Sequence, residues 1–316
     1  MARDSSCVSC GGTGARFVCE KPMTAGPRRS VVLDRCTACG LVYQRGWKQT
    51  FEADLYDYYA LRTEWPIERV YKPVNARRII ELLAKLGAKV SGRRLLDVGC
   101  GAGQFVAVAA SLGWDARGID LSEPAVRIGR RFGARCDLVD FFAETLDEER
   151  FDLIVMSELI EHVPNPARFL ARASALLADG GLTYITTPNF RSLSRHIVGM
   201  DWSVISSQHI SYFTPTTFRA VVEKQTDLHV ASLATRNMSP ETVEKLKSVV
   251  KRPPARATAV TARARAEAPL PAAPADLRTQ IEGSRVLRTA KGAINLFLDA
   301  ASVGDSLFAE LRKRPS

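Results

Sequence analysis

The chain has 316 residues, of which 46% are hydrophobic and 25% are charged, and its formal net charge is +10. That length suits one full-sized domain with an appended module, and the composition is that of an ordinary globular protein. No run approaches the roughly 18 to 20 uncharged apolar residues of a membrane-spanning helix, and the first residues lack the apolar run of a secretory signal. We therefore expect a cytoplasmic protein without a membrane partner.

Much of the positive charge lies in one low-complexity stretch from Lys251 to Arg278, where Pro, Ala and Arg dominate. Its composition predicts a disordered insertion over residues 238–283, in which the charge serves for solvation. Clustered Lys and Arg can attract nucleic acid by releasing counterions. Outside the insertion the basic residues are dispersed and are not interleaved with aromatic ones, which argues against a nucleic-acid partner.

Two CxxC pairs, Cys7/Cys10 and Cys36/Cys39, mark the amino end of the chain. Each CxxC turn can present two thiolates to one ion, and four thiolates complete the tetrahedral shell of a structural zinc ion. The pattern predicts a zinc-binding module over residues 1–50, with a short apolar strand at residues 30–36. The alternative is a metal-free remnant in which the cysteines serve as small apolar residues. The thiols of the other three cysteines are expected to be ordinary buried groups: Cys19, Cys100 and Cys136.

Residues 51–90 predict a helical connector between this module and the rest of the chain. The segment begins with an aromatic group, Tyr56, Tyr58 and Tyr59, and continues into a run of helical periodicity that ends at Gly87. A glycine directly after such a run is a common helix stop.

After Ser91, short apolar strands alternate with amphipathic helices, which is typical of βαβ units and a parallel sheet. The fold class is therefore α/β: a doubly wound, mostly parallel sheet of seven strands. We expect the main domain at residues 91–237 and a closing helix and strand at residues 284–316. The predicted strands cover residues 94–100, 116–121, 135–141, 151–157, 182–188, 228–236 and 306–314, and the helices between them include residues 104–113, 123–133, 166–180 and 214–225.

A glycine-rich loop follows the first of these strands and directly precedes a helix. Gly99, Gly101 and Gly103 form a GxGxG pattern there. Glycine suits such a loop because a Cβ atom would block the approach of a ligand to the backbone. Domains that bind nicotinamide cofactors space their glycines GxGxxG to seat a pyrophosphate, and this loop is one residue shorter.

Asp120 ends the second strand, about one βαβ unit after the loop. A carboxylate at that place can accept hydrogen bonds from both hydroxyls of a ribose. Loop and carboxylate together predict a ligand of adenosine type that needs no phosphate. The alternative is that Asp120 is only a turn residue before the next helix.

Four segments, in this order, are similar to the class I S-adenosylmethionine-dependent methyltransferases: LLDVGCGAGQF, GIDLS, FDLIVMSELIEHVPNP and LTYITTPN. The resemblance spans about residues 91–230. The two CxxC pairs, the segment DLYDYYA and residues 202–215 further resemble a bacterial subgroup that methylates small molecules, including deoxysugars of natural products and surface glycans. The resemblance implies a Rossmann-like fold, S-adenosylmethionine as cofactor, and a sugar or other hydroxylated metabolite as acceptor.

The resemblance also assigns residues to the cofactor. The loop residues would flank its methionine and ribose, Asp97 would orient the loop and the methionine ammonium group, and Ser157 with Glu158 would lie near the sulfonium. Asp140 and Phe141 would neighbour the adenine ring, at positions where the family varies. The complete cofactor set is Asp97, Gly99, Cys100, Gly101, Gly103, Asp120, Leu121, Asp140, Phe141 and Ser157.

His162 is the candidate general base. Methyl transfer is an in-line displacement that depends on placing the acceptor atom, and a hydroxyl acceptor gains from a base with a near-neutral pKa. Glu161 could orient the His162 ring, and His209 with Tyr212 forms a second candidate site in a segment that could fold over the acceptor pocket. The alternatives are that His162 ties its loop to the next helix, and that the second segment only caps the fold.

Two rival functions remain open. An RNA or protein methyltransferase could use the zinc module to grip a polymer, although the dispersed charge argues against it. A nonenzymatic zinc-bearing interaction protein is disfavoured because the glycine loop and Asp120 are both intact. We also expect the module and the connector to cover the open edge of the cofactor cleft and to shape the acceptor site. The acceptor, the methylated atom and the oligomeric state are not determined by the sequence.

Overall fold

The computed structural model describes residues 6–23, 30–47, 71–250 and 285–315. The predicted aromatic group of the connector, Tyr56, Tyr58 and Tyr59, and residues 251–283 of the predicted insertion lie outside the described residues. Within the described ranges, no helix has both the length and the apolar composition needed to cross a bilayer.

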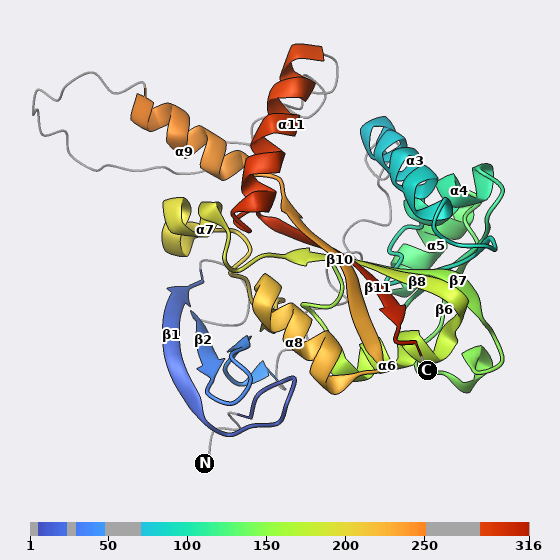
Figure 1. Cartoon of the computed structure of the whole chain (residues 1–316), viewed down its shortest axis with the longest axis horizontal. Coiled ribbons are helices and arrows are strands. Elements are labelled where there is room, and N and C mark those ends of the chain that lie inside the picture. Colours follow the sequence, from blue (N-terminus) through green and yellow to red (C-terminus); the bar gives the residue numbers. More distant parts are fainter. Residues whose placement is uncertain (1–5, 24–29, 48–70, 251–284, 316) are drawn as a thin grey trace, which may run out of the picture.

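A seven-stranded sheet with strand order β10-β11-β8-β7-β4-β5-β6 forms the centre of the molecule (Figure 1). Strands β8, β7, β4, β5 and β6 run parallel to one another. Strand β11 lies between β8 and β10 and is antiparallel to both. This arrangement confirms the predicted α/β class and the mostly parallel sheet. The strands are β4 (Arg94–Val98), β5 (Asp115–Asp120), β6 (Cys136–Leu138), β7 (Phe151–Ser157), β8 (Leu177–Pro188), β10 (Leu228–Arg236) and β11 (Ser306–Lys313).

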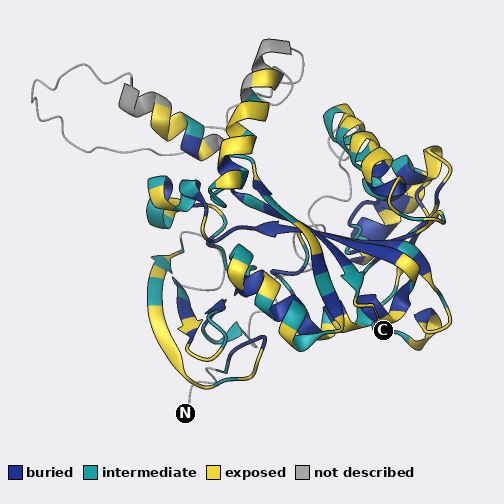
Figure 2. Cartoon of the chain, viewed as in Figure 1, coloured by how far each residue is buried: buried dark blue, intermediate teal, exposed yellow. Residues whose placement is uncertain are grey.

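Helices cover both faces of this sheet. Successive residues of a strand point to opposite faces, so Leu95 of β4 packs into one hydrophobic core and Leu96 into the other. The first core contains buried residues of α3 (Pro73–Gly87), α4 (Gln104–Ser111) and α5 (Glu123–Arg131). The second contains buried residues of α6 (Pro166–Leu176) and α8 (Pro215–Gln225). Because both faces are covered, the central strands β4 and β7 and the second half of β8 are almost continuously buried (Figure 2).

Helix caps fix the loops that leave the carboxyl ends of the strands. Ser122 accepts a hydrogen bond from the N–H of Ala125 at the start of α5, and Asn165 accepts one from Arg168 at the start of α6. Thr214 and Thr217 form a capping box at the start of α8. Each cap satisfies a backbone N–H that the helix leaves open, and each cap closely follows a segment with predicted site residues.

The structure corrects three predicted boundaries. The helix predicted at residues 166–180 ends at Leu176, because Leu177 already pairs with Phe151 of β7. Strand β6 is shorter than predicted because it ends at Leu138, where pairing with β5 stops and the chain turns toward Asp140. Residues 240–250, predicted as part of a disordered insertion, form α9 (Pro240–Val250), which begins after the Ser239 hydroxyl accepts a hydrogen bond from the Thr242 N–H. The closing helix is α11 (Arg285–Ala300).

The amino-terminal module is a four-stranded antiparallel sheet with order β1-β2-β3-β9. Its strands are β1 (Ala15–Pro22), β2 (Ser30–Cys36), β3 (Val42–Gln44) and β9 (Ser211–Tyr212). Only β2 was predicted from the sequence. Since β9 follows the fifth parallel strand of the main domain, the module is joined to the main domain by a shared sheet and lies beside α8 (Figure 1).

A third hydrophobic core lies between the module and residues 190–212. It combines β2 and β3 side chains with four aromatic or apolar ones of the later segment, Phe190, Trp202, Ile205 and Tyr212. Lys21 of β1 adds hydrogen bonds from its Nζ to the carbonyl oxygens of Trp202 and Ile205, at 3.0 and 2.8 Å. The short helix α7 (Leu193–Val198) and the 3₁₀ turn η3 (Gly199–Asp201) complete this region.

Candidate active site and cysteine cluster

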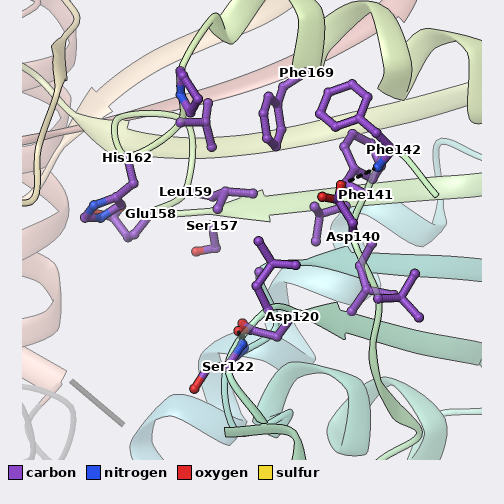
Figure 3. Close-up of a pocket in the computed structure, with 18 of the residues that line it drawn as sticks. Asp120, Ser122, Asp140, Phe141, Phe142, Ser157, Glu158, Leu159, His162 and Phe169 are labelled. Carbon is purple, nitrogen blue, oxygen red and sulfur yellow. Dashed lines mark hydrogen bonds between the residues drawn. The ribbon is translucent and has the colours of Figure 1, made fainter. Parts of the chain in front are cut away.

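A cavity of about 590 Å³ opens at the carboxyl ends of β4, β5 and β7. Its volume suits a drug-sized ligand, and ligands of open α/β sheets bind at this edge. The close-up shows the phenylalanines at one side, Glu158 and His162 at the opposite side, Ser157 between them and Asp120 below (Figure 3). The cavity thus joins the residues predicted for the cofactor to those predicted for the acceptor.

The three loop glycines have left-handed backbones, with φ of +72° at Gly99, +53° at Gly101 and +73° at Gly103. Gly99 and Gly101 line the cavity, and a Cβ on Gly99 would lie 3.0 Å from Leu159 Cδ1. Gly103 lies behind the loop instead, where a Cβ would come within 2.5 Å of the Cys136 sulfur. The first two glycines therefore leave room at the cavity wall, whereas the third allows the loop to pack against β6.

Asp120 ends β5 on the cavity wall. Its Oδ2 accepts a hydrogen bond from the Gly101 N–H and its Oδ1 accepts one from the Ser122 N–H, both at 2.8 Å. Burial raises the pKa of Asp120, and these backbone hydrogen bonds oppose the rise. Each carboxylate oxygen keeps a further lone pair, so the oriented group can still accept a hydrogen bond from a ligand hydroxyl.

Asp97 is buried behind the glycine loop and, like Cys100 and Gly103, is not part of the described cavity lining. Burial, followed by the negative charge of Asp120, raises the pKa of Asp97 to about 8. A carboxyl in that environment is stabilised as an anion by a nearby cation. Asp97 thus lies behind the loop rather than at the described cavity wall, and its contact with the methionine ammonium group stays a prediction.

An aromatic group encloses the other side of the cavity. Phe142 and Phe169 meet edge to face with ring centroids 4.9 Å apart, and Phe141 stacks on Phe169 at 5.8 Å. The Arg168 guanidinium lies 4.0 Å from the centroid of Phe142, and Asp140 Oδ1 accepts a hydrogen bond from the Phe142 N–H. Apolar rings with a nearby carboxylate suit a flat heteroaromatic ring with exocyclic N–H donors.

The sequence analysis named Asp140 and Phe141 here but missed Phe142, Arg168 and Phe169, all of which line the cavity. The signal that could have found the last two is their place in the first turn of α6, the helix that follows β7. The predicted cofactor residues Leu121 and Ser157 also line the cavity.

His162 lies on the opposite wall, where Nδ1 is 2.9 Å from the carbonyl oxygen of Gln208. A carbonyl accepts only, so Nδ1 carries the proton and donates, and Nε2 keeps a lone pair. Burial lowers the pKa of His162, and the Gln208 carbonyl opposes this. The ring meets that of His209 edge to face, with centroids 4.6 Å apart.

Glu161 is buried directly behind His162. Its Oε2 accepts a hydrogen bond from Thr187 Oγ1 at 2.9 Å, and its Oε1 lies 3.9 Å from His162 Nε2. That distance is too long for a hydrogen bond, so the described contact that orients the His162 ring is the Gln208 carbonyl rather than Glu161. Burial, followed by the charge of Glu158, raises the pKa of Glu161 well above its ordinary value.

The segment with the second candidate site is held against this wall by backbone hydrogen bonds. The N–H groups of Ile210 and Ser211 both donate to the Glu161 carbonyl oxygen, at 2.9 and 3.0 Å. Burial, followed by the neighbouring His162, lowers the pKa of His209 to about 3. Tyr212 is turned away, because its hydroxyl donates to the Ser206 carbonyl. The structure thus places His209 against His162, whereas the Tyr212 hydroxyl is used in a hydrogen bond within the fold.

The two CxxC segments form matching turns. Gly11 and Gly40 have φ of +70° and +77°, and their N–H groups donate to the carbonyl oxygens of Cys7 and Cys36, both at 3.0 Å. The four sulfurs of Cys7, Cys10, Cys36 and Cys39 lie within 4.8 Å of one another, and two cross-pairs are separated by 3.6 Å. Zn–S bonds of about 2.3 Å place tetrahedral sulfurs about 3.8 Å apart, so the cluster fits a zinc ion.

Comparison with known proteins identifies the family of the chain. A family model described as a methyltransferase domain matches residues 71–233, about half of the chain. The chain belongs to this methyltransferase family. Its fold and loop are those of the class I S-adenosylmethionine-dependent enzymes, which confirms the family and the enzyme class predicted from the sequence.

Three similar proteins illustrate the relationship. The ubiquinone biosynthesis O-methyltransferase of Bordetella avium (strain 197N) is 29% identical to this chain over 174 residues, which cover 52% of this chain and 70% of that protein. The protein of the same name from Bradyrhizobium sp. (strain ORS 278) is 33% identical over 144 residues, covering 43% and 57%. The plantazolicin methyltransferase BpumL, solved in complex with SAH, has a TM-score of 0.50 at 15% identity, covering 85% and 94%. At that identity the structural likeness shows the fold alone.

The described residues of the methyltransferase fit S-adenosylmethionine. Asp120 can accept hydrogen bonds from its ribose hydroxyls, and the phenylalanine side suits its adenine ring. The left-handed glycines at the cavity wall leave the space that a Cβ would fill.

Proposed function

We propose that this methyltransferase transfers the methyl group of S-adenosylmethionine to a hydroxyl of a small molecule, such as a sugar or another hydroxylated metabolite. The observation that carries the proposal is the continuity of the cavity from Asp120, through Ser157, to Glu158 and His162. The relatives named O-methyltransferases support oxygen as the methylated atom. The cavity volume of about 590 Å³ supports a small acceptor beside the cofactor.

S-adenosylmethionine, when bound, supplies an electrophilic methyl group on a sulfonium. The chain's part is to hold the two reactants in line, because positioning is the main contribution that a protein can make to such a displacement. Asp120 would hold the ribose, in the middle of the cofactor, through hydrogen bonds from its hydroxyls. The phenylalanine side, formed by Phe141, Phe142 and Phe169, would hold the adenine ring at one end.

The acceptor half is formed by Glu158, His162 and the backbone at Gln208. Of the described cavity-lining groups on this wall, the Glu158 carboxylate and the His162 Nε2 lone pair can receive a hydrogen bond from an acceptor hydroxyl. Residues 202–214 follow behind this wall and reduce the access of water, since Trp202, Ile205 and Ile210 are buried there. A drier wall strengthens these polar contacts.

The amino-terminal module is proposed to bind one structural zinc ion and to stiffen the acceptor wall. Its strand β3 pairs with β9, which lies only two residues after His209. The Ser9 hydroxyl also donates to the Gln225 side chain of α8, and Cys7 and Cys36 belong to the same core as α6 and α8. A metal that fixes the CxxC turns therefore fixes the strand on which the His209 segment rests.

A labelled-methyl assay tests the proposal. The full chain is incubated with S-adenosylmethionine labelled in its methyl group and with an extract that contains both small metabolites and polymers. We expect the label in the small-molecule fraction, in an ether linkage that resists alkaline hydrolysis. At a limiting concentration of S-adenosylmethionine, the Asp120→Asn variant should transfer at least about tenfold less label. Label found only in RNA or protein would overturn the proposal and favour a polymer substrate.

A further inference from the structure

One carboxylate oxygen of Glu161 is buried without a hydrogen-bond partner among the described residues, and the proposed function assigns it no role. Its side chain is only 1% exposed, and Oε2 is held by the Thr187 hydroxyl. The other oxygen, Oε1, is buried and has no hydrogen-bond partner among the described residues. A buried carboxylate oxygen without a partner is costly, because burial removes its hydration and nothing replaces it.

The histidine that faces Glu161 is oriented as metal-binding histidines are. His162 donates from Nδ1 to the Gln208 carbonyl at 2.9 Å, which leaves the lone pair on Nε2, and Nε2 is 3.9 Å from Glu161 Oε1. Histidines that bind metals usually donate their other ring N–H to a carbonyl or carboxylate, and ligating carboxylates are themselves hydrogen-bonded. Both features are present in this pair.

His209 adds a third donor from a different part of the chain. One nitrogen or oxygen atom from each of Glu161, His162 and His209 lies within 4.8 Å of the other two. Atoms that share one metal at bond lengths of about 2.0 to 2.2 Å must lie within roughly 4.4 Å of each other, so small side-chain rotations bring the three into a common shell. We propose that Glu161, His162 and His209 bind one divalent transition-metal ion at the acceptor end of the cavity.

The ligand set and the local charge both favour a divalent cation. Imidazole suits Zn²⁺, Fe²⁺, Ni²⁺ and Cu²⁺, carboxylate and water suit Mn²⁺, and two histidines with one carboxylate leave coordination positions open. Two carboxylates, Glu161 in the ligand set and Glu158 on the same cavity wall as His162, supply negative charge that a divalent cation offsets. This site differs from the cysteine cluster, whose four sulfurs fill a tetrahedral shell.

The role of the ion rests on the proposed function, whereas the site itself does not. His162 lines the cavity, whereas Glu161 and His209 are not part of its described lining. The ion would therefore lie at the cavity wall, where a coordination position left open by the three ligands would reach an acceptor hydroxyl. A cation lowers the pKa of a bound hydroxyl, whose proton then passes to Glu158 or to water. The O–C bond forms as the C–S bond breaks, and the electron pair of that bond stays on sulfur. In this arrangement His162 is a metal ligand and not the proton acceptor predicted from the sequence.

Manganese binding tests the inference in the full chain with zinc already bound at the cysteines. Mn²⁺ prefers oxygen and nitrogen over thiolate ligands, so an electron paramagnetic resonance titration reports the second site alone. We expect one Mn²⁺ per chain, with ¹⁴N couplings from imidazole in the spin-echo spectrum. Glu161→Gln and His162→Asn should weaken binding by at least about tenfold. The control variants Glu148→Gln and His196→Asn, at exposed positions outside the cavity, should bind as the parent does.

Several results would overturn the inference. They are a failure of both Mn²⁺ and Zn²⁺ to bind beyond the cysteine cluster, a bound Mn²⁺ without ¹⁴N coupling, or equal affinity in the site and control variants. Water alone at the Glu161 carboxylate would produce the first result. The wild-type spectrum decides the matter if a variant does not fold. If the chain methylates hydroxyls without this ion, the proposed function stands and the role of the ion fails. If the chain binds Mn²⁺ but methylates no small molecule, the metal site stands and the proposed function fails.

Discussion

Alanine at Gly103 should destabilise the fold much more than alanine at Gly99, although both belong to the same loop. Both glycines have left-handed backbones, which cost an alanine about 1–2 kcal/mol. At Gly103 the new Cβ would also lie 2.5 Å from Cys136 Sγ and 2.8 Å from Ala134 Cβ, and such overpacking adds about 1–3 kcal/mol. At Gly99 the nearest atom is Leu159 Cδ1 at 3.0 Å, the end of a side chain that can rotate.

Gly103→Ala should therefore lower the free energy of unfolding by about 2–5 kcal/mol, and Gly99→Ala by about 1–2 kcal/mol. Chemical denaturation of the parent and both variants measures these values. Titration with S-adenosylhomocysteine should show the opposite order, because Gly99 lines the described cavity and Gly103 does not. We expect binding about tenfold weaker for Gly99→Ala, or about 1.4 kcal/mol. Equal stability of the two variants would refute the assignment of Gly103 to packing.

Two further predictions concern charge and metal. Asp97 has a pKa of about 8 in the fold and an ordinary one near 4 when unfolded, so the folded chain holds the extra proton and its stability falls as pH rises from 4 to 8, by at most about 1.4 kcal/mol per pH unit. Asp97→Asn should remove that decline in pH-dependent denaturation, and a slope equal to that of the exposed control Asp179→Asn would contradict it. Cys36→Ser should reduce bound zinc from one equivalent to none and lower the melting temperature, whereas Cys19→Ser should change neither; a full zinc equivalent in Cys36→Ser would disprove the cluster.

Local patterns in the sequence were enough to predict the main sheet. Parallel strands buried on both faces appear as short apolar runs, and Phe151–Ser157 occurs as predicted. The antiparallel edge strand Leu228–Arg236 also has its predicted bounds. The errors in the predicted bounds arose where pairing with a neighbouring strand decides where a helix or strand ends. Leu177 belongs to β8 only because it meets Phe151 across the sheet, and no local signal indicates that partner.

The module shows a limit of a different kind. The sequence of β2 has an apolar pattern of its own, but β3 and β9 have only three and two residues. They are strands because they pair with each other across about 170 positions of sequence. Contacts of that range cannot be predicted from periodicity, so the joining of the module to the His209 segment was missed.

In the candidate site, the sequence identified residues on loops with a distinctive chemistry and missed those that depend on helix placement. The glycine loop, Asp120 and His162 stand out as motifs, and all three contribute to one cavity. Arg168 and Phe169 are common residue types in a helix, and only the packing of α6 turns them toward Phe142. The sequence analysis suggested that Glu161 orients the His162 ring. The 3.9 Å between Glu161 Oε1 and His162 Nε2 is too long for a hydrogen bond, and this distance cannot be obtained from the sequence.

The most direct measurement is calorimetric titration of the parent chain and of Asp120→Asn with S-adenosylhomocysteine. The amide of Asn would present an NH₂ group toward one of the two N–H donors that now hold the carboxylate, and it would lose charge-assisted hydrogen bonds worth about 1.5–3 kcal/mol each. We predict one equivalent bound to the parent and an affinity lower by roughly 10- to 100-fold in the variant. No binding to the parent, or equal binding to both chains, would contradict the location of the cofactor in this cavity.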